Sequence, residues 1–158
     1  MDTAQADEDP RARIVQQLRE QTGIDERMIE QLVRSFYARI RDDELLGPVF
    51  EARIQDWEPH LQRMCAFWSS VVLSSGVYRG QPMRMHLPLP VDARHFDRWL
   101  ELFERTAREL FSEEVAVHFI EPARRIATSL EFGIASSQGV LLGRGERFVR
   151  SLGGNDHE

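Results

Sequence analysis

Residues 57–72 read WEPHLQRMCAFWSSVV, a stretch in which inward-facing side chains recur at steps of three and four. That spacing places them on one face of an α-helix. The residues on this face are His60, Met64, Phe67 and Val71. Pro59 falls in the first turn, where its missing N–H costs little. We therefore expect a helix over 56–75, ended by Gly76, whose inward face carries His60.

Similar periodicity on both sides of this stretch predicts further helices, and no segment gives a convincing strand pattern. These helices are expected over 9–22, 25–43, 92–111 and 112–132. Pro122 should kink the last of them or split it. Residues 44–50 are broken by Gly-Pro, and residues 77–91 hold enough glycine and proline to permit only one or two helical turns, around 83–87. The sequence therefore predicts an all-α fold.

The composition and net charge of the chain exclude several classes of function. The chain has 158 residues, a length that suits one domain, and a net charge of −6 with no lysine. An acidic protein with scattered arginines lacks the concentrated positive face that nucleic acids or anionic membranes require. The single cysteine, Cys65, excludes an intramolecular disulfide framework. There is no apolar run of about 18 residues and no secretory-type N-terminus, so we expect a cytoplasmic protein.

Several polar ring side chains stand at positions that should face the interior. His60 and Tyr37 project from inward helix faces, Trp99 comes from the 92–111 helix, and His86 lies in the short proline-bounded segment. Each would cost roughly 1–3 kcal/mol if buried without a partner. Something polar should therefore occupy the space between them. A flat metal macrocycle, held by one axial imidazole with an open site opposite, suits this arrangement.

The residues that carry these groups belong to ordered pieces of sequence. The pieces are FY (36–37), LLGPVF (45–50), WEPH (57–60), FWSS (67–70), YRGQPMRMHL (78–87) and HFDRWLELF (95–103). Together, over residues 24–132, they resemble the truncated hemoglobins of group III. The resemblance implies a truncated-globin fold, a two-over-two helical sandwich. Residues 1–23 would then be an N-terminal extension, and residues 133–158 a Gly-rich C-terminal extension.

The resemblance also implies a cofactor, heme b, and a ligand for its iron. His86 matches the proximal histidine, whereas the rival His95 lies on a regular helix. Tyr37 and Trp99 match the distal tyrosine and tryptophan. His60 matches a histidine of the distal helix, which could gate the pocket, donate a hydrogen bond or serve as a second iron ligand.

Other residues would surround the porphyrin. Phe50 matches a phenylalanine that packs on the ring, and Met64, Phe67 and Trp68 line or back the distal side, although Phe67 is expected to be ordinary core. For the heme propionates the candidates are Tyr78, Arg79 and Arg84, with Arg94 a weaker one. Cys65 reads as a small core residue.

The activity implied is binding of dioxygen or another diatomic gas. A hydrogen bond to a charged acceptor is worth roughly 1.5–3 kcal/mol, so donation from Tyr37 and Trp99 predicts slow oxygen release. Nitric-oxide or peroxide chemistry is compatible with the same donors, and either would need a separate reductase. One alternative is a heme-free, globin-like interaction or sensor module. Another is a mononuclear metal hydrolase that uses His60, His86 and a carboxylate.

Overall fold

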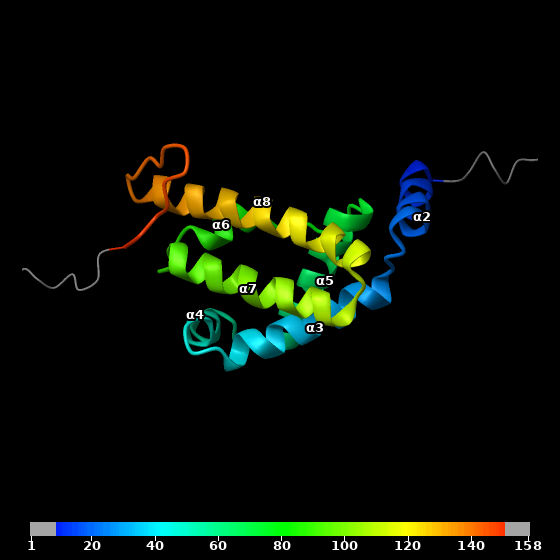
Figure 1. Cartoon of the computed structure of the whole chain (residues 1–158), viewed down its shortest axis with the longest axis horizontal. Helices are drawn as coiled ribbons and strands as arrows, with labels where there is room; N and C mark the ends of the chain where they lie inside the picture. The colour runs from blue at the N-terminus through cyan, green and yellow to red at the C-terminus, as the bar shows by residue number, and fades with distance from the viewer. Residues whose placement is uncertain (1–8, 151–158) are drawn as a thin grey trace, which may run out of the picture.

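The computed structural model describes residues 9–150, and within them the chain forms helices and no strand (Figure 1). The helices are α2 (Pro10–Thr22), α3 (Glu26–Asp42), α4 (Leu46–Arg53), α5 (Trp57–Leu73), α6 (Pro82–His86), α7 (Ala93–Leu110) and α8 (Glu113–Ser137). The outer ends of both expected extensions, residues 1–8 and 151–158, lie outside the described part of the chain. The all-α prediction is confirmed.

Four long helices make up the body of the fold. Helices α7 and α8 lie side by side (Figure 1), and α3 packs against both α5 and α7. Helix α5 also contacts α8, so the α3–α5 pair faces the α7–α8 pair. The core between the pairs is aromatic: Phe36, Trp68, Phe103 and Phe119 are all buried. Trp68 stacks on Phe103 with ring centroids 5.0 Å apart.

Capping side chains set the helix starts where the sequence placed them. The Asp25 carboxylate accepts a hydrogen bond from the Met28 N–H at 2.9 Å, and Asp9 caps the N-terminus of α2, which begins with Pro10. Asp92 and His95 form a capping box at the start of α7. Such bonds satisfy backbone N–H groups that have no partner inside the helix.

Two expected helix ends were wrong. Helix α5 stops at Leu73 because Ser74 adopts a left-handed conformation with φ of 55°, so Gly76 is not the terminator. Helix α8 is a single helix that passes through Pro122 and continues beyond Phe132 to Ser137. Its residues on both sides of the proline, Phe119 and Ala123, are fully buried, and that packing outweighs the lost hydrogen bond.

Two short helices pack against the four long ones, α4 against α3 and α7, and α6 against α8. Helix α4 has eight residues, with Gly47-Pro48 in its first turn, and α6 has five. After α8, residues 138–150 fold back across the α7–α8 pair, and Phe148 is buried there. No helix within residues 9–150 has both the length and the apolar character needed to cross a membrane.

Candidate functional site

A single cavity brings together most of the residues singled out by sequence. Water-sized molecules can be centred within about 200 Å³ of this cavity, which opens to solvent. The predicted residues that line it are Tyr37, Phe50, His60, Met64, Phe67, Trp68, Tyr78, His86 and Trp99. They come from five helices and one loop, so only the tertiary fold makes them neighbours.

His86 is the last residue of α6, and its ring is fixed by the helix itself. Its Nδ1 lies 2.6 Å from the backbone carbonyl oxygen of Pro82. A carbonyl only accepts hydrogen bonds, so Nδ1 carries the proton and Nε2 keeps a free lone pair in the neutral ring. Burial lowers the pKa of His86, against an opposing effect of the Pro82 hydrogen bond. The imidazole is therefore neutral, and it lines the cavity with one nitrogen free of a partner within residues 9–150.

Tyr37 and His60 form a second polar group within the same cavity. Their ring centroids are 5.1 Å apart and the rings are perpendicular. The Nε2 atom of His60 is buried and has no hydrogen-bond partner within residues 9–150. The Tyr37 side chain is 6% exposed, and its hydroxyl likewise makes no hydrogen bond in that part of the chain. Neither group thus has a hydrogen-bond partner within residues 9–150, and of the two atoms only the His60 Nε2 is fully enclosed.

Burial also sets the charge of these two side chains. Burial raises the pKa of Tyr37, so the phenol keeps its proton at neutral pH. Burial, helped by the positive charge of Arg63, lowers the pKa of His60 to about 4. The distal group is consequently neutral near pH 7, and the phenol is available as a donor.

Trp99 enters the cavity from α7 and is held by aromatic neighbours. Its ring stacks on Phe103 at 5.4 Å and meets Phe36 edge-on at 5.4 Å. These contacts fix the plane of the indole. Phe50 packs edge-on against Tyr37 at 5.8 Å. Phe67 lines the cavity and is only partly buried, although the sequence favoured ordinary core at that position.

His95, the rival of His86, also lines the cavity but is occupied elsewhere. Its Nδ1 accepts a hydrogen bond from the backbone N–H of Asp92 at 3.1 Å, as part of the capping box. The carboxylate of Asp92 lies 3.3 Å from the same nitrogen. His86 is the histidine whose Nδ1 is satisfied by a backbone carbonyl.

Of the side chains predicted to bind the carboxylates of a ligand, some line the cavity and others do not. Tyr78 lines the cavity, with its ring edge-on to Phe67 at 5.2 Å. Arg79 and Arg84 are exposed and do not line the cavity, and Arg79 donates to the Gly76 carbonyl at 3.2 Å.

Arg94 is paired with Asp92 at 3.0 Å. Arg63 does line the cavity, and the sequence reading missed it. The signal was its position three residues after His60 on the same helix.

The sequence reading also left out part of the cavity's apolar wall. The missed residues are Leu46, Val49, Met85, Leu89, Val91, Phe96, Ile126, Ala127 and Leu130. Those on α8 belong to its apolar stripe, but periodicity alone does not say whether such a stripe faces protein or a ligand.

The metal hydrolase alternative finds no support in this part of the chain. Within residues 9–150 there is no group of three or more histidine, cysteine or carboxylate side chains that could hold a metal ion. An apolar cavity in which one lining histidine, His86, has its Nδ1 held by a carbonyl and its Nε2 free instead fits a planar cofactor that brings its own metal ligands. The orphaned His60 nitrogen and the unpaired Tyr37 hydroxyl fit a small polar ligand next to that cofactor.

Comparison with known proteins agrees with this fit. Residues 17–131 match the family model for bacterial-like globins. The chain is 33% identical over 113 residues to the group 3 truncated hemoglobin ctb of Campylobacter jejuni, a match that covers 68% of this chain and 89% of that protein.

A crystal structure of group III truncated hemoglobin from Campylobacter jejuni superposes with a TM-score of 0.64 at 34% identity, again over 68% and 89% of the two chains. The chain therefore belongs to the bacterial-like (truncated) globins, and these relatives place it in group III, a membership that implies a heme cofactor.

Proposed function

We propose that this protein binds heme b through His86 and holds a diatomic gas, dioxygen in particular, beside Tyr37, His60 and Trp99. One observation carries the proposal: a histidine with a free Nε2 shares an apolar cavity with a buried His60 nitrogen and a Tyr37 hydroxyl, neither of which has a hydrogen-bond partner within residues 9–150. When bound, the heme iron supplies an open coordination position that takes a diatomic gas reversibly.

His86 would provide the axial nitrogen, and the structure supports that role in two ways. The ring is neutral, as a metal-ligating imidazole must be. Its other nitrogen donates to Pro82, the kind of contact that fixes the tautomer and raises the basicity of a metal-binding histidine.

Tyr37 and Trp99 would stabilise the bound gas by donating hydrogen bonds. Tyr37 keeps its proton because burial raises its pKa, and its hydroxyl has no competing acceptor within residues 9–150. A hydrogen bond to a charged or strongly polarised ligand is worth roughly 1.5–3 kcal/mol, which slows dissociation about ten- to a hundredfold. We infer slow oxygen release, which suits storage, sensing or chemistry better than delivery.

The remaining lining residues would hold the cofactor itself. Phe50, Met64 and Trp68 supply apolar contacts for the porphyrin faces. Arg63 and Tyr78 lie where they could meet the propionate carboxylates, because an arginine pairs well with a carboxylate in bidentate geometry. Arg79 and Arg84, the arginines favoured by sequence, are less favoured for that role because they lie outside the cavity lining.

The test is titration of the purified full chain with hemin, followed by reduction and exposure to carbon monoxide. We expect a Soret absorption band that saturates at one hemin per chain and shifts when carbon monoxide is added. His118→Ala removes an exposed histidine of α8 that does not line the cavity, and this control variant should take up hemin as the wild-type chain does. If the wild-type chain forms no such band, the protein is a heme-free module and the proposal fails.

A further inference from the structure

The residues that follow α8 make an ordered attachment to the cavity wall. The C-terminal segment, residues 139–150, lies beyond residue 131, where the family match ends. Phe148 is 5% exposed, and its carbonyl accepts a hydrogen bond from the Ala93 N–H at 2.7 Å. Its own N–H donates to the Glu131 carboxylate at 2.8 Å. The segment is thus anchored to the start of α7 and to the end region of α8.

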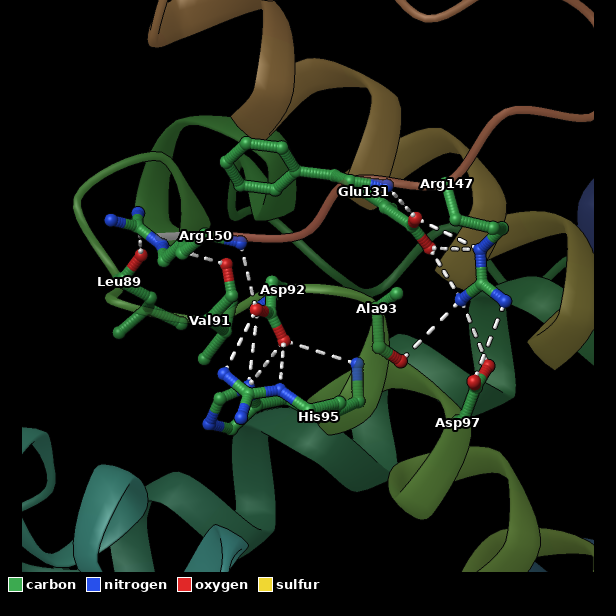
Figure 2. Close-up of polar contacts among 11 residues, drawn as sticks. Leu89, Val91, Asp92, Ala93, His95, Asp97, Glu131, Arg147 and Arg150 are labelled. Carbon is green, nitrogen blue, oxygen red and sulfur yellow. Dashed lines mark hydrogen bonds and ion pairs between the residues drawn. The ribbon is translucent and has the colours of Figure 1, made fainter. Parts of the chain in front are cut away.

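Arg147 makes the first of two side-chain anchors (Figure 2). Its guanidinium lies 2.9 Å from the buried carboxylate of Glu131 and 2.8 Å from that of Asp97. It also reaches the Ala93 carbonyl at 3.4 Å. All of these partners lie on α7 and α8, so Arg147 ties the C-terminal segment to the helical body.

Arg150 makes the second anchor, and its partners lie in the segment that joins α6 to α7 (Figure 2). Its Nε donates to the Val91 carbonyl at 3.1 Å and its Nη2 to the Leu89 carbonyl at 3.2 Å. Its backbone N–H donates to the buried Asp92 carboxylate at 3.0 Å. Leu89 and Val91 both line the cavity, and they follow His86 by three and five residues.

The segment between His86 and α7 has few internal means of holding its shape. Two of its six residues, Pro88 and Pro90, have no N–H to donate. Within the segment the backbone bonds are Leu89 N–H to the His86 carbonyl and Val91 N–H to the Leu89 carbonyl. The Leu87 N–H also donates to the Met83 carbonyl of α6 at 3.1 Å, and Val91 is buried in an apolar cluster. Side chains from outside the segment add the two bonds of Arg150 and a bond from Arg53 to the Pro88 carbonyl at 3.1 Å.

We propose that Arg150 is a positioning residue for the heme pocket: by holding the Leu89 and Val91 carbonyls, it fixes the segment 87–91 and thereby the placement of His86. The inference rests on the proposed function. It gives the C-terminal segment, which lies outside the matched globin region, a part in cofactor retention. A planar cofactor bound through one axial nitrogen dissociates more slowly when that nitrogen is held in place.

The test compares three variants of the full chain: Arg150→Gln, the conservative Arg150→Lys and the control Arg144→Gln. Arg144 is an exposed arginine of the same C-terminal segment, and it has no hydrogen bond or ion pair within residues 9–150. The first measurement is amide hydrogen exchange at Leu89 and Val91 in the chain as purified. The second is the rate at which hemin leaves the reconstituted chain for an excess of apomyoglobin.

For Arg150→Gln we expect exchange at Leu89 and Val91 and the rate of hemin loss each to rise about tenfold, the factor equivalent to about 1.4 kcal/mol. Arg150→Lys should fall between this variant and wild type, because an ammonium can reach one carbonyl but not both at fixed angles. Arg144→Gln should match wild type. Exchange of the buried α3 amides should not change in any variant.

Three results would overturn the inference. Amide exchange at Leu89 and Val91 in Arg150→Gln could equal that in Arg144→Gln. Exchange in Arg150→Gln could also rise equally in α3, which would indicate general destabilisation. Its exchange could also rise at Leu89 and Val91 while hemin loss stays at the wild-type rate. Failure of the proposed function looks different: the wild-type chain itself would take up no hemin, and the exchange data alone would then decide whether Arg150 holds the segment.

Discussion

The Nδ1 atom of His86 lies 2.6 Å from the carbonyl oxygen of Pro82, four residues earlier in the same short helix. This contact assigns the proton to Nδ1 and leaves Nε2 free. The same cavity is lined by Tyr37, whose hydroxyl keeps its proton, and by His60, and neither that hydroxyl nor the His60 Nε2 has a hydrogen-bond partner within residues 9–150. One imidazole of the cavity is thus fixed by the backbone, whereas the Tyr37 hydroxyl and the His60 nitrogen are left for a partner from outside the described residues.

Tyr37→Phe should speed oxygen release from the ferrous reconstituted protein. The substitution removes only the hydroxyl, so the ring contacts with Phe36, Phe50 and His60 are kept. Loss of one hydrogen bond to a polar ligand should raise the off-rate about ten- to a hundredfold. Stopped-flow displacement of oxygen by carbon monoxide measures it. An off-rate within a factor of two of wild type would show that Tyr37 does not hold the gas.

Trp99→Phe should also speed oxygen release from the ferrous reconstituted protein. Phenylalanine keeps an aromatic ring against Phe103 but has no N–H. We expect faster oxygen release, and in the double variant with Tyr37→Phe the two effects should not simply add, because both donors face one ligand. If Trp99→Phe alone releases oxygen at the wild-type rate, the indole serves packing only.

His60→Leu should leave the folding stability of the heme-free chain unchanged or raise it. The His60 Nε2 is buried without a partner within residues 9–150, and removing such a group relieves a cost of about 1–3 kcal/mol. Phe36→Ala, in the fully buried core, should instead lower the free energy of unfolding by about 3–5 kcal/mol. Urea unfolding gives both values. A His60→Leu chain destabilised as much as Phe36→Ala would mean that His60 has a structural partner.

Asp92 should make stability depend on acid pH. Burial alone would raise its pKa, but hydrogen bonds from Arg94 and from the Arg150 backbone lower it to about 2, from an ordinary 3.8. His95 also faces this carboxylate. A carboxyl whose folded-state pKa is depressed stabilises the protein fully above the unfolded value and loses that effect as the pH falls through the folded one.

The stabilising effect of the Asp92 carboxylate should therefore be lost between pH 3.8 and about pH 2. Asp92→Asn should be less stable than wild type at pH 5 by an amount on the order of 2 kcal/mol, and this gap should close near pH 2. Asp97→Asn, at an exposed carboxylate, is the control and should show a smaller gap. Chemical unfolding at both pH values gives the comparison, and a gap that does not change with pH would contradict it.

Most helices could be predicted from the sequence because the signals that specify a helix are local in the chain. Caps at Asp9, Asp25 and Asp92 and apolar spacing in α5 and α7 are patterns that repeat within a few residues. The end of α5 was missed because a left-handed serine is rarer than a left-handed glycine.

The attachment of Arg147 and Arg150 could not be predicted from sequence. Their partners Asp97, Glu131 and Asp92 are 16 to 58 residues away, and exposed arginines look alike in a sequence. For the same reason, the sequence did not distinguish Arg63 from the other arginines. Sequence named nine residues of the cavity wall, yet only the folded structure shows which of the arginines reach it.

The most direct test of the whole account is the visible spectrum of His86→Gly reconstituted with hemin, recorded without and with free imidazole. The glycine variant should lose the histidine-ligated ferrous spectrum of wild type, and added imidazole should restore it by filling the space of the missing ring. His95→Gly should keep the wild-type spectrum. A His86→Gly protein whose ferrous spectrum equals that of wild type would show that another side chain ligates the iron, and would contradict the account.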